Sequence, residues 1–181
     1  SSYGAAQSFI YSKLLSKFIF VCASPTSPNG KYLHSTDGIT WTLATNLPNI
    51  SYITWNRILE DYAGGRIYII SANCTKIVYT TNLSSWTTVT TSGLSSGTMA
   101  IINGIGIAAR SVDPSAVCNV WTSTNLTAWT SIAGSGGNGS YPGGPPGFHY
   151  HSFTSGNTLA ITANTSGIYK GKIGVAVASV V

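Results

Sequence analysis

Four carboxylic acids are the side chains of this 181-residue sequence that could act as acids or bases, namely Asp37, Glu60, Asp61 and Asp113. Hydrolysis of a glycosidic bond typically uses two carboxylates, one on each side of the bond. Glu60 and Asp61 cannot form such a pair on a strand, because adjacent side chains point to opposite faces. Asp37 lies in a Ser-Thr-Asp-Gly stretch that is typical of a turn. We therefore predict no catalytic residue and a protein that is not an enzyme.

Two histidines, His149 and His151, flank Tyr150. Strand alternation would place both imidazoles on one face, where they could hold a metal ion, with three copies meeting around a threefold axis. The simpler interpretation is a pair of polar side chains on the outer face of a strand. We predict no metal and no cofactor, and assign both histidines to a binding surface.

Residues 134–147 form a Gly/Pro-rich stretch that contains Tyr141 and is followed by Phe148 and Tyr150. Such insertions are surface loops, and loops on a rigid scaffold often carry binding. Aromatic rings can stack on sugar rings or on partner side chains. We predict that these three aromatic residues form the ligand or partner surface, with a plain connector as the alternative.

An internal repeat shows which elements must position these residues. Three similar stretches are "STDGITWT" at 35–42, "TTNLSSWT" at 80–87 and "STNLTAWT" at 123–130. Their tryptophans, Trp41, Trp86 and Trp129, are spaced by 45 and then 43 residues. A period of this size indicates blades or solenoid coils.

Each repeat contains four short runs of strand-forming residues separated by turn residues. The second run of each unit is the most apolar, as strands covered on both faces are. Residues 55–65 are the one helix-like candidate, and they end in a Gly pair. We predict one all-β domain, a small β-propeller-like fold of about four four-stranded antiparallel blades. The units are residues 1–47, 48–93, 94–135 and 148–181.

The Asp-Gly pair Asp37-Gly38 lies between the third and fourth runs, where a tight hairpin is needed. Asn82 and Asn125 occupy the place of Asp37 in the other two copies. Because an Asp that is replaced by Asn in two copies is not a proton carrier, we predict structural roles for these turns. The three tryptophans are expected to cover the turns and pack against the next unit.

The first copy resembles the Asp box, or bacterial neuraminidase repeat, whose pattern is Ser-x-Asp-x-Gly-x-Thr-Trp. The matching residues are Ser35, Asp37, Gly38, Thr40 and Trp41, with one residue missing between Asp37 and Gly38. The other copies keep only the hydroxyl, the Asn and the Trp-Thr pair. The resemblance implies a propeller with the box as a fold element on the blade periphery, as in sialidases, sortilin-like receptors and bacteriophage tail proteins. The low charge and the degenerate repeats look most like the phage proteins, and trimeric phage spikes and fibres use His-x-His to hold a metal.

A sialidase of that family would need an arginine trio, a Tyr-Glu pair and an acidic proton donor. Arg57, Arg66 and Arg110, with Glu60, are barely enough for this, and four units are found where family sialidases have six blades. The sequence therefore favours the family's fold over its hydrolase activity.

Charged residues make up 7% of the chain, against about 25% in typical soluble domains. The nine basic residues are scattered, which argues against nucleic-acid binding. No apolar run reaches the roughly 18 residues of a membrane span, so no membrane insertion is expected. Cys22, Cys74 and Cys118 are expected to be small buried side chains, with one disulfide and one thiol as the alternative.

Together these patterns predict a non-catalytic phage virion protein, a receptor-binding domain that recognises host surface carbohydrate. The alternatives are a structural capsid or tail module that joins other virion subunits, and a sialidase-like glycosidase. The expected location is the virion, outside the cell. The expected partners are a host glycan or other virion subunits, and a homotrimer is compatible with the histidine pair.

Overall fold

The computed structural model describes most of the first three units and the backbone of three strands of the fourth. The described residues are 6–22, 31–48, 55–71, 74–92, 94, 98–111, 118–131, 149–155, 158–165 and 167–168. Among them no helix is long and apolar enough to cross a membrane.

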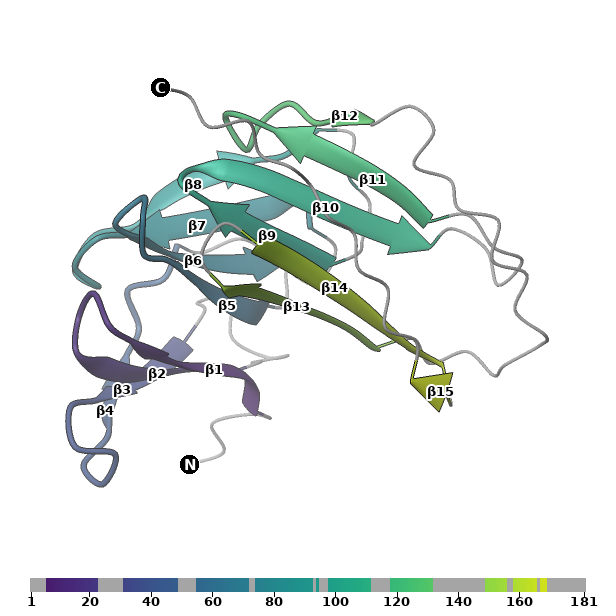
Figure 1. Cartoon of the computed structure of the whole chain (residues 1–181). Coiled ribbons are helices and arrows are strands. Elements are labelled where there is room, and N and C mark those ends of the chain that lie inside the picture. The colour runs from purple at the N-terminus through teal and green to yellow at the C-terminus, as the bar shows by residue number, and fades with distance from the viewer. Residues whose placement is uncertain are drawn as a thin grey trace.

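The described strands form four antiparallel sheets that follow one another in chain order (Figure 1). Sheet 1 consists of β1 (Ala6–Ser12), β2 (Lys17–Cys22), β3 (Lys31–Ser35) and β4 (Thr42–Ala44). Sheet 2 consists of β5 (Trp55–Asp61), β6 (Arg66–Ser71), β7 (Lys76–Thr80) and β8 (Thr87–Thr90). Sheet 3 consists of β9 (Thr98–Ile102), β10 (Ile105–Ser111), β11 (Cys118–Ser123) and β12 (Thr130–Ser131). Sheet 4 consists of β13 (His149–Ser155), β14 (Thr158–Thr165) and β15 (Gly167–Ile168).

The predicted fold class is confirmed, because the protein is all-β and each sheet is an antiparallel meander of consecutive strands. The first strands lie next to one another, since β1 contacts β5, β5 contacts β9 and β9 contacts β13. The helix-like stretch 55–65 is instead a strand and a turn, with Ile58 opposite Ile69. Its apolar residues face both sides of the sheet. Backbone pairing with β6 makes this stretch a strand rather than a helix. Each Trp of the repeat lies directly before the fourth strand of its sheet, which is β4, β8 or β12.

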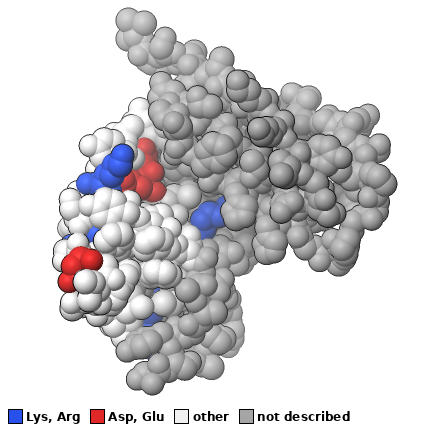
Figure 2. Space-filling model, turned by 60° about the horizontal axis from the view of Figure 1, so that its bottom comes forward, with Lys and Arg blue, Asp and Glu red and all other residues white. Residues whose placement is uncertain are grey.

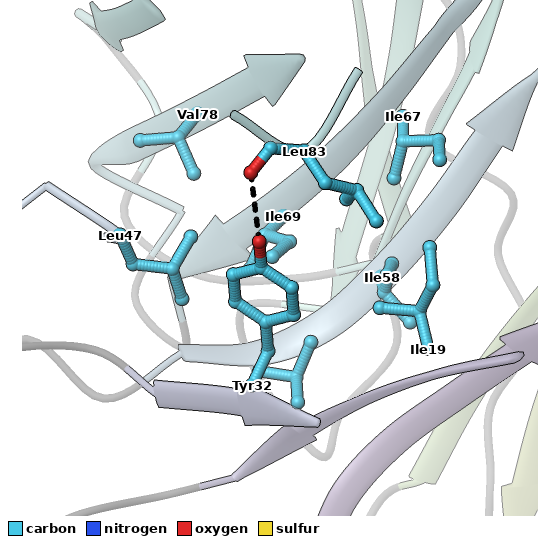
Figure 3. Packing of buried hydrophobic residues seen from close by; sticks show 9 residues of the cluster. Ile19, Tyr32, Leu47, Ile58, Ile67, Ile69, Val78 and Leu83 are labelled. Atoms are coloured by element: carbon cyan, nitrogen blue, oxygen red, sulfur yellow. Dashed lines mark hydrogen bonds between the residues drawn. The ribbon is translucent and has the colours of Figure 1, made fainter. Parts of the chain in front are cut away.

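Among the described side chains, the core consists of two layers, one between sheets 1 and 2 and one between sheets 2 and 3. Between sheets 1 and 2, Ile19, Val21 and Tyr32 pack with Ile67 and Ile69 (Figure 3). Between sheets 2 and 3 a second cluster packs around the side chains of Tyr68, Ile70, Met99, Ala108 and Leu126. β6 contributes alternate residues to both layers, and five of its six residues are buried. Burial on both faces explains why its sequence is a continuous apolar run.

The meander gives the molecule two different ends. At one end, which we call the turn end, short turns join the first strand of a sheet to its second and the third to its fourth. At the other end, the loop end, the connections 23–30, 112–117 and 132–148 begin and finish, because β2, β10 and β12 all end there. Strands β10 and β14 run in the same direction in Figure 1, so sheets 3 and 4 share this polarity.

Candidate functional site

The three stretches of the repeat form turns of one geometry, which we call the Trp turns (35–41, 80–86 and 123–129). In the first, the Asp37 Oδ1 atom accepts hydrogen bonds from the amides of Ile39 at 2.8 Å and Thr40 at 2.7 Å. In the second, Asn82 Oδ1 accepts from Ser84 and Ser85 at 2.9 and 3.2 Å. In the third, Asn125 Oδ1 accepts from Thr127 and Ala128 at 2.9 and 3.0 Å. One carboxylate or amide oxygen therefore holds each turn.

The residue after the Asp or Asn has a left-handed backbone in all three turns. The φ angles are 75° at Gly38, 63° at Leu83 and 62° at Leu126. Leu83 and Leu126 accept this strained conformation and bury their side chains between sheets, with 6% and 4% exposed. At Gly38 a Cβ atom would lie 3.5 Å from the Phe18 ring, so this ring occupies the space that a leucine fills elsewhere.

The tryptophans close the turns in two different ways. The indole nitrogens of Trp41 and Trp129 donate to the carbonyls of Gly38 at 3.2 Å and Leu126 at 3.0 Å. In the second turn the equivalent carbonyl of Leu83 instead accepts the Tyr32 hydroxyl of sheet 1 at 2.8 Å (Figure 3). Trp86 packs its ring edge-on against Tyr32, with ring centroids 5.6 Å apart. The second Trp turn is thus tied to the preceding sheet.

Glu60 and Asp61 hold turns of the two neighbouring sheets. The Glu60 carboxylate accepts from the amides of Lys13 and Leu14 in sheet 1 at 3.1 and 3.4 Å. Asp61 is 2% exposed and accepts from Asn103 and Gly104 in sheet 3, both at 2.8 Å. The two carboxylates point to opposite sides of sheet 2, as the sequence predicted, and neither faces the other across a space for substrate.

Hydrogen bonds to the ionised carboxylate hold the pKa of Asp37 well below its usual range, with the Thr40 and Ile39 amides and the Ser35 hydroxyl as donors. An acid of this kind is a poor proton donor at neutral pH. Burial raises the pKa of the Cys22 and Cys74 thiols, which form no disulfide, so neither is an activated nucleophile.

The arginine trio of a sialidase is not brought together. Arg66 lies at the turn end, opposite Asp61, with its guanidinium over the Tyr79 ring at 4.7 Å. Arg57 lies opposite Ile70, toward the loop end, and burial lowers its pKa. Arg110 is the sixth residue of β10 and lies at the loop end. In the described part of the chain, no three His, Cys, Asp or Glu side chains are placed to hold a metal ion.

Three of the predicted binding residues, His149, Tyr150 and His151, lie in β13, which starts at the loop end. His149 and Tyr150 begin β13, where His149 is opposite Asn164 and His151 is opposite Thr162. Tyr141, Phe148 and Asp113 lie outside the described residues. Asp113 comes two residues after the end of β10 in the sequence, and His149 opens β13. The other three carboxylates hold turns at the opposite end.

The sequence analysis missed a group of exposed aromatic residues on sheet 1. Phe9 and Tyr11 are 47% and 49% exposed, and their rings contact Phe20 and Phe18 with centroids 4.7 and 4.9 Å apart. Charged side chains are few on the described surface in Figure 2. The signal was present in "SFIYS" and "KFIF", where the aromatic residues occupy every second position and therefore share one face of the sheet.

Comparison with known proteins identifies a solved structure with a similar fold. No family model matches the sequence, and no curated protein matches it. The structure is similar to Zg3597, a family 117 glycoside hydrolase from the marine bacterium Zobellia galactanivorans, with a TM-score of 0.53 and 11% identity. The similarity covers 90% of this chain and 62% of that one, so the chain spans less than two thirds of its neighbour's length. A member of the GH130 family, which contains mannoside phosphorylases and glycoside hydrolases that target β-1,2 mannosidic linkages in Candida mannan, superposes with a TM-score of 0.48, 14% identity and coverage of 90% and 59%.

These findings contradict two predictions made from the sequence. The chain was expected to be a non-catalytic phage virion protein that binds host carbohydrate, yet the similar solved structure is a family 117 glycoside hydrolase and nothing in the comparisons points to a phage. The prediction that it is not an enzyme was wrong for the same reason. That prediction rested on the lack of two carboxylates in the sequence that could face each other.

Proposed function

We propose that this chain acts on carbohydrate as a domain of glycoside-hydrolase type. The observation that carries the proposal is the arrangement of four antiparallel sheets, which is similar to that of Zg3597, a family 117 glycoside hydrolase. A sequence rich in Ser, Thr and Asn, with 11% aromatic and 7% charged residues, suits a ligand of hydroxyl groups and apolar ring faces.

The loop end is the proposed catalytic end. Hydrolysis of a glycosidic bond needs one group to protonate the leaving oxygen and another to activate water. Asp37, Glu60 and Asp61 already accept backbone hydrogen bonds at the turn end. Asp113 is the remaining carboxylate side chain and follows β10 by two residues in the sequence, and His149 begins β13 at the loop end. We assign the acid–base roles to these two residues, since an imidazole titrates near neutral pH.

The connection 132–148 supplies the proposed glycan contacts. It begins and finishes at the loop end, between β12 and β13, and it contains Tyr141 and Phe148. We assign the stacking on sugar rings to these two residues and to Tyr150 at the start of β13. His151 follows on the same strand as part of this surface.

The test is a screen of the purified chain against a panel of plant, algal, fungal and bacterial polysaccharides. New reducing ends are measured, and released oligosaccharides are identified by mass spectrometry. We expect cleavage of at least one glycan that the protein also binds. Binding of a glycan without any release of fragments would contradict the proposal.

A further inference from the structure

One side of sheet 1 is apolar and uncovered. On β1 and β2, Phe9 lies opposite Phe20 and Tyr11 opposite Phe18, so the four rings share one side of the sheet. Leu33 continues this side on β3, because it is opposite Phe20. We define the aromatic face as Phe9, Tyr11, Phe18, Phe20, Leu33, Leu43 and Trp41.

The internal repeat identifies the surfaces of sheets 2 and 3 that are equivalent to the aromatic face of sheet 1. Phe18, Ile67 and Gly106 lie opposite the first residues of the three Trp turns, which are Ser35, Thr80 and Ser123. They therefore occupy the same place in sheets 1, 2 and 3. Two residues further along the second strand, Phe20, Ile69 and Ala108 are likewise equivalent.

In sheets 2 and 3 this side is covered by the preceding sheet. Ile67 and Ile69 belong to the cluster that contains Ile19 and Val21 of sheet 1. Ala108 belongs to the cluster that contains Tyr68 and Ile70 of sheet 2. Phe18 and Phe20 hold the same place in sheet 1, where Phe9 and Tyr11 beside them remain about half exposed.

The Trp turns repeat this relationship at the edge of the sheet. Asn46, after the fourth strand of sheet 1, donates to the carbonyls of Leu83 at 2.8 Å and Ser84 at 3.1 Å in the second Trp turn. Ser92, after the fourth strand of sheet 2, donates its amide to the Thr127 carbonyl of the third at 2.8 Å. The residue equivalent to Ser84 and Thr127 in the first Trp turn is Ile39, which is 85% exposed.

We propose that the aromatic face is the docking surface for sheet 4 of a second copy of this chain. Sheets of this chain fill the two equivalent surfaces, and sheet 4 is the last in the described order. The chain's own sheet 4 packs beside β9 and leaves the aromatic face open. Two such contacts, related by a twofold axis, would close two four-sheet units into one ring. A ring of about eight blades is at the upper end of the common range for propellers.

The first test measures mass in solution as a function of concentration, by light scattering or sedimentation. We expect twice the chain mass of 18.9 kDa for the wild-type chain. Tyr11→Lys and Ile39→Lys should each return the mass to one chain at concentrations where the wild type is a dimer. Tyr62→Lys is the matched control, since Tyr62 is 65% exposed and lies outside the aromatic face, and it should stay dimeric. A wild-type chain that is monomeric at all concentrations would overturn the proposal.

The second test identifies the surface that docks. A photo-crosslinking side chain at position 11, in a mixture of isotopically light and heavy chains, should link to residues 149–168 of the other copy. Links from position 11 to position 11 would show that two aromatic faces meet each other, which would overturn the proposed arrangement. If Tyr11→Lys abolishes glycan binding and the wild type is monomeric, the face is a sugar platform and the proposal fails, whereas the proposed activity at the loop end is left standing.

Discussion

Glu60 and Asp61 are adjacent in the sequence, and their carboxylates hold the turns of opposite neighbouring sheets. Glu60 accepts from Lys13 in sheet 1, and Asp61 accepts from Asn103 in sheet 3. Because adjacent residues of a strand point to opposite faces, Glu60 binds the sheet on one side of sheet 2 and Asp61 binds the sheet on the other side. This relationship explains why two of the few acids of the chain are unavailable for catalysis.

Asp61→Ala should be strongly destabilising, because it leaves three backbone amides near a buried position without their acceptor. These are the amides of Gly64, Asn103 and Gly104. We expect a loss of about 3 kcal/mol or more in the free energy of unfolding, measured by urea titration. Glu60→Ala removes a less buried hydrogen-bond acceptor and should lower the free energy of unfolding by about 1 kcal/mol. Equal losses of unfolding free energy in the two variants would contradict the greater role that we assign to the buried Asp61 carboxylate.

Asp37 should make the stability depend on pH in the acid range. Its pKa in the folded protein lies below the ordinary value of about 3.9, so the ionised form stabilises the fold. This contribution is fully present above the unfolded pKa and is lost as the pH falls from about 4 toward the lowered folded pKa. Asp37→Asn should keep the turn, as in the copies with Asn82 and Asn125, and should flatten the stability profile below about pH 4.

Unfolding by urea at pH 5 and at pH 2.5 measures this effect for the wild type and for Asp37→Asn. The reciprocal variant, Asn82→Asp, should add a second contribution of the same sign. An unchanged acid profile in both variants would show that these hydrogen bonds do not favour the ionised carboxylate.

Gly106 should be required by the third Trp turn. A Cβ atom at this position would lie 2.4 Å from Trp129 Cη2 and 2.7 Å from Leu126 Cδ2. Gly106→Ala should therefore cost about 1–3 kcal/mol of stability. Combining it with Leu126→Ala frees space, so the double variant should lose less than the sum of the single variants, by about 0.5 kcal/mol or more. Strict additivity would mean that the clash is relieved elsewhere.

Replacing residues 134–147 by Gly-Ser-Gly should abolish glycan binding and leave the melting temperature nearly unchanged. The connection joins β12 and β13, and its sequence interrupts the period of the repeat, so we expect the sheets not to depend on it. Binding is measured by calorimetry with the glycan that the screen identifies. Normal glycan binding by the shortened chain would show that this segment only joins β12 to β13 and does not contact the ligand.

The fold could be predicted from the sequence because the repeat is local. The Trp-Thr pairs and the Asp or Asn before them mark the same hairpin in three sheets, and the continuous apolar run at 67–70 marks a strand covered on both faces. The site was harder to predict. Asp113 and His149, to which we assign the chemistry, are far apart in the sequence, and no local motif links them. The exposure of Phe9 and Tyr11 was also hidden, since an apolar pattern does not reveal whether a neighbouring sheet covers it.

The most direct test of the proposed function compares glycan cleavage by the wild type with cleavage by Asp113→Asn, His149→Gln and the control Asp37→Asn. The control removes a carboxylate that only holds a turn, so it should retain wild-type turnover. The account predicts that Asp113→Asn and His149→Gln each lower kcat at least about 100-fold, as expected for loss of a general acid or base, with the fold intact by circular dichroism. Wild-type turnover in both variants would contradict the assignment of catalysis to the loop end.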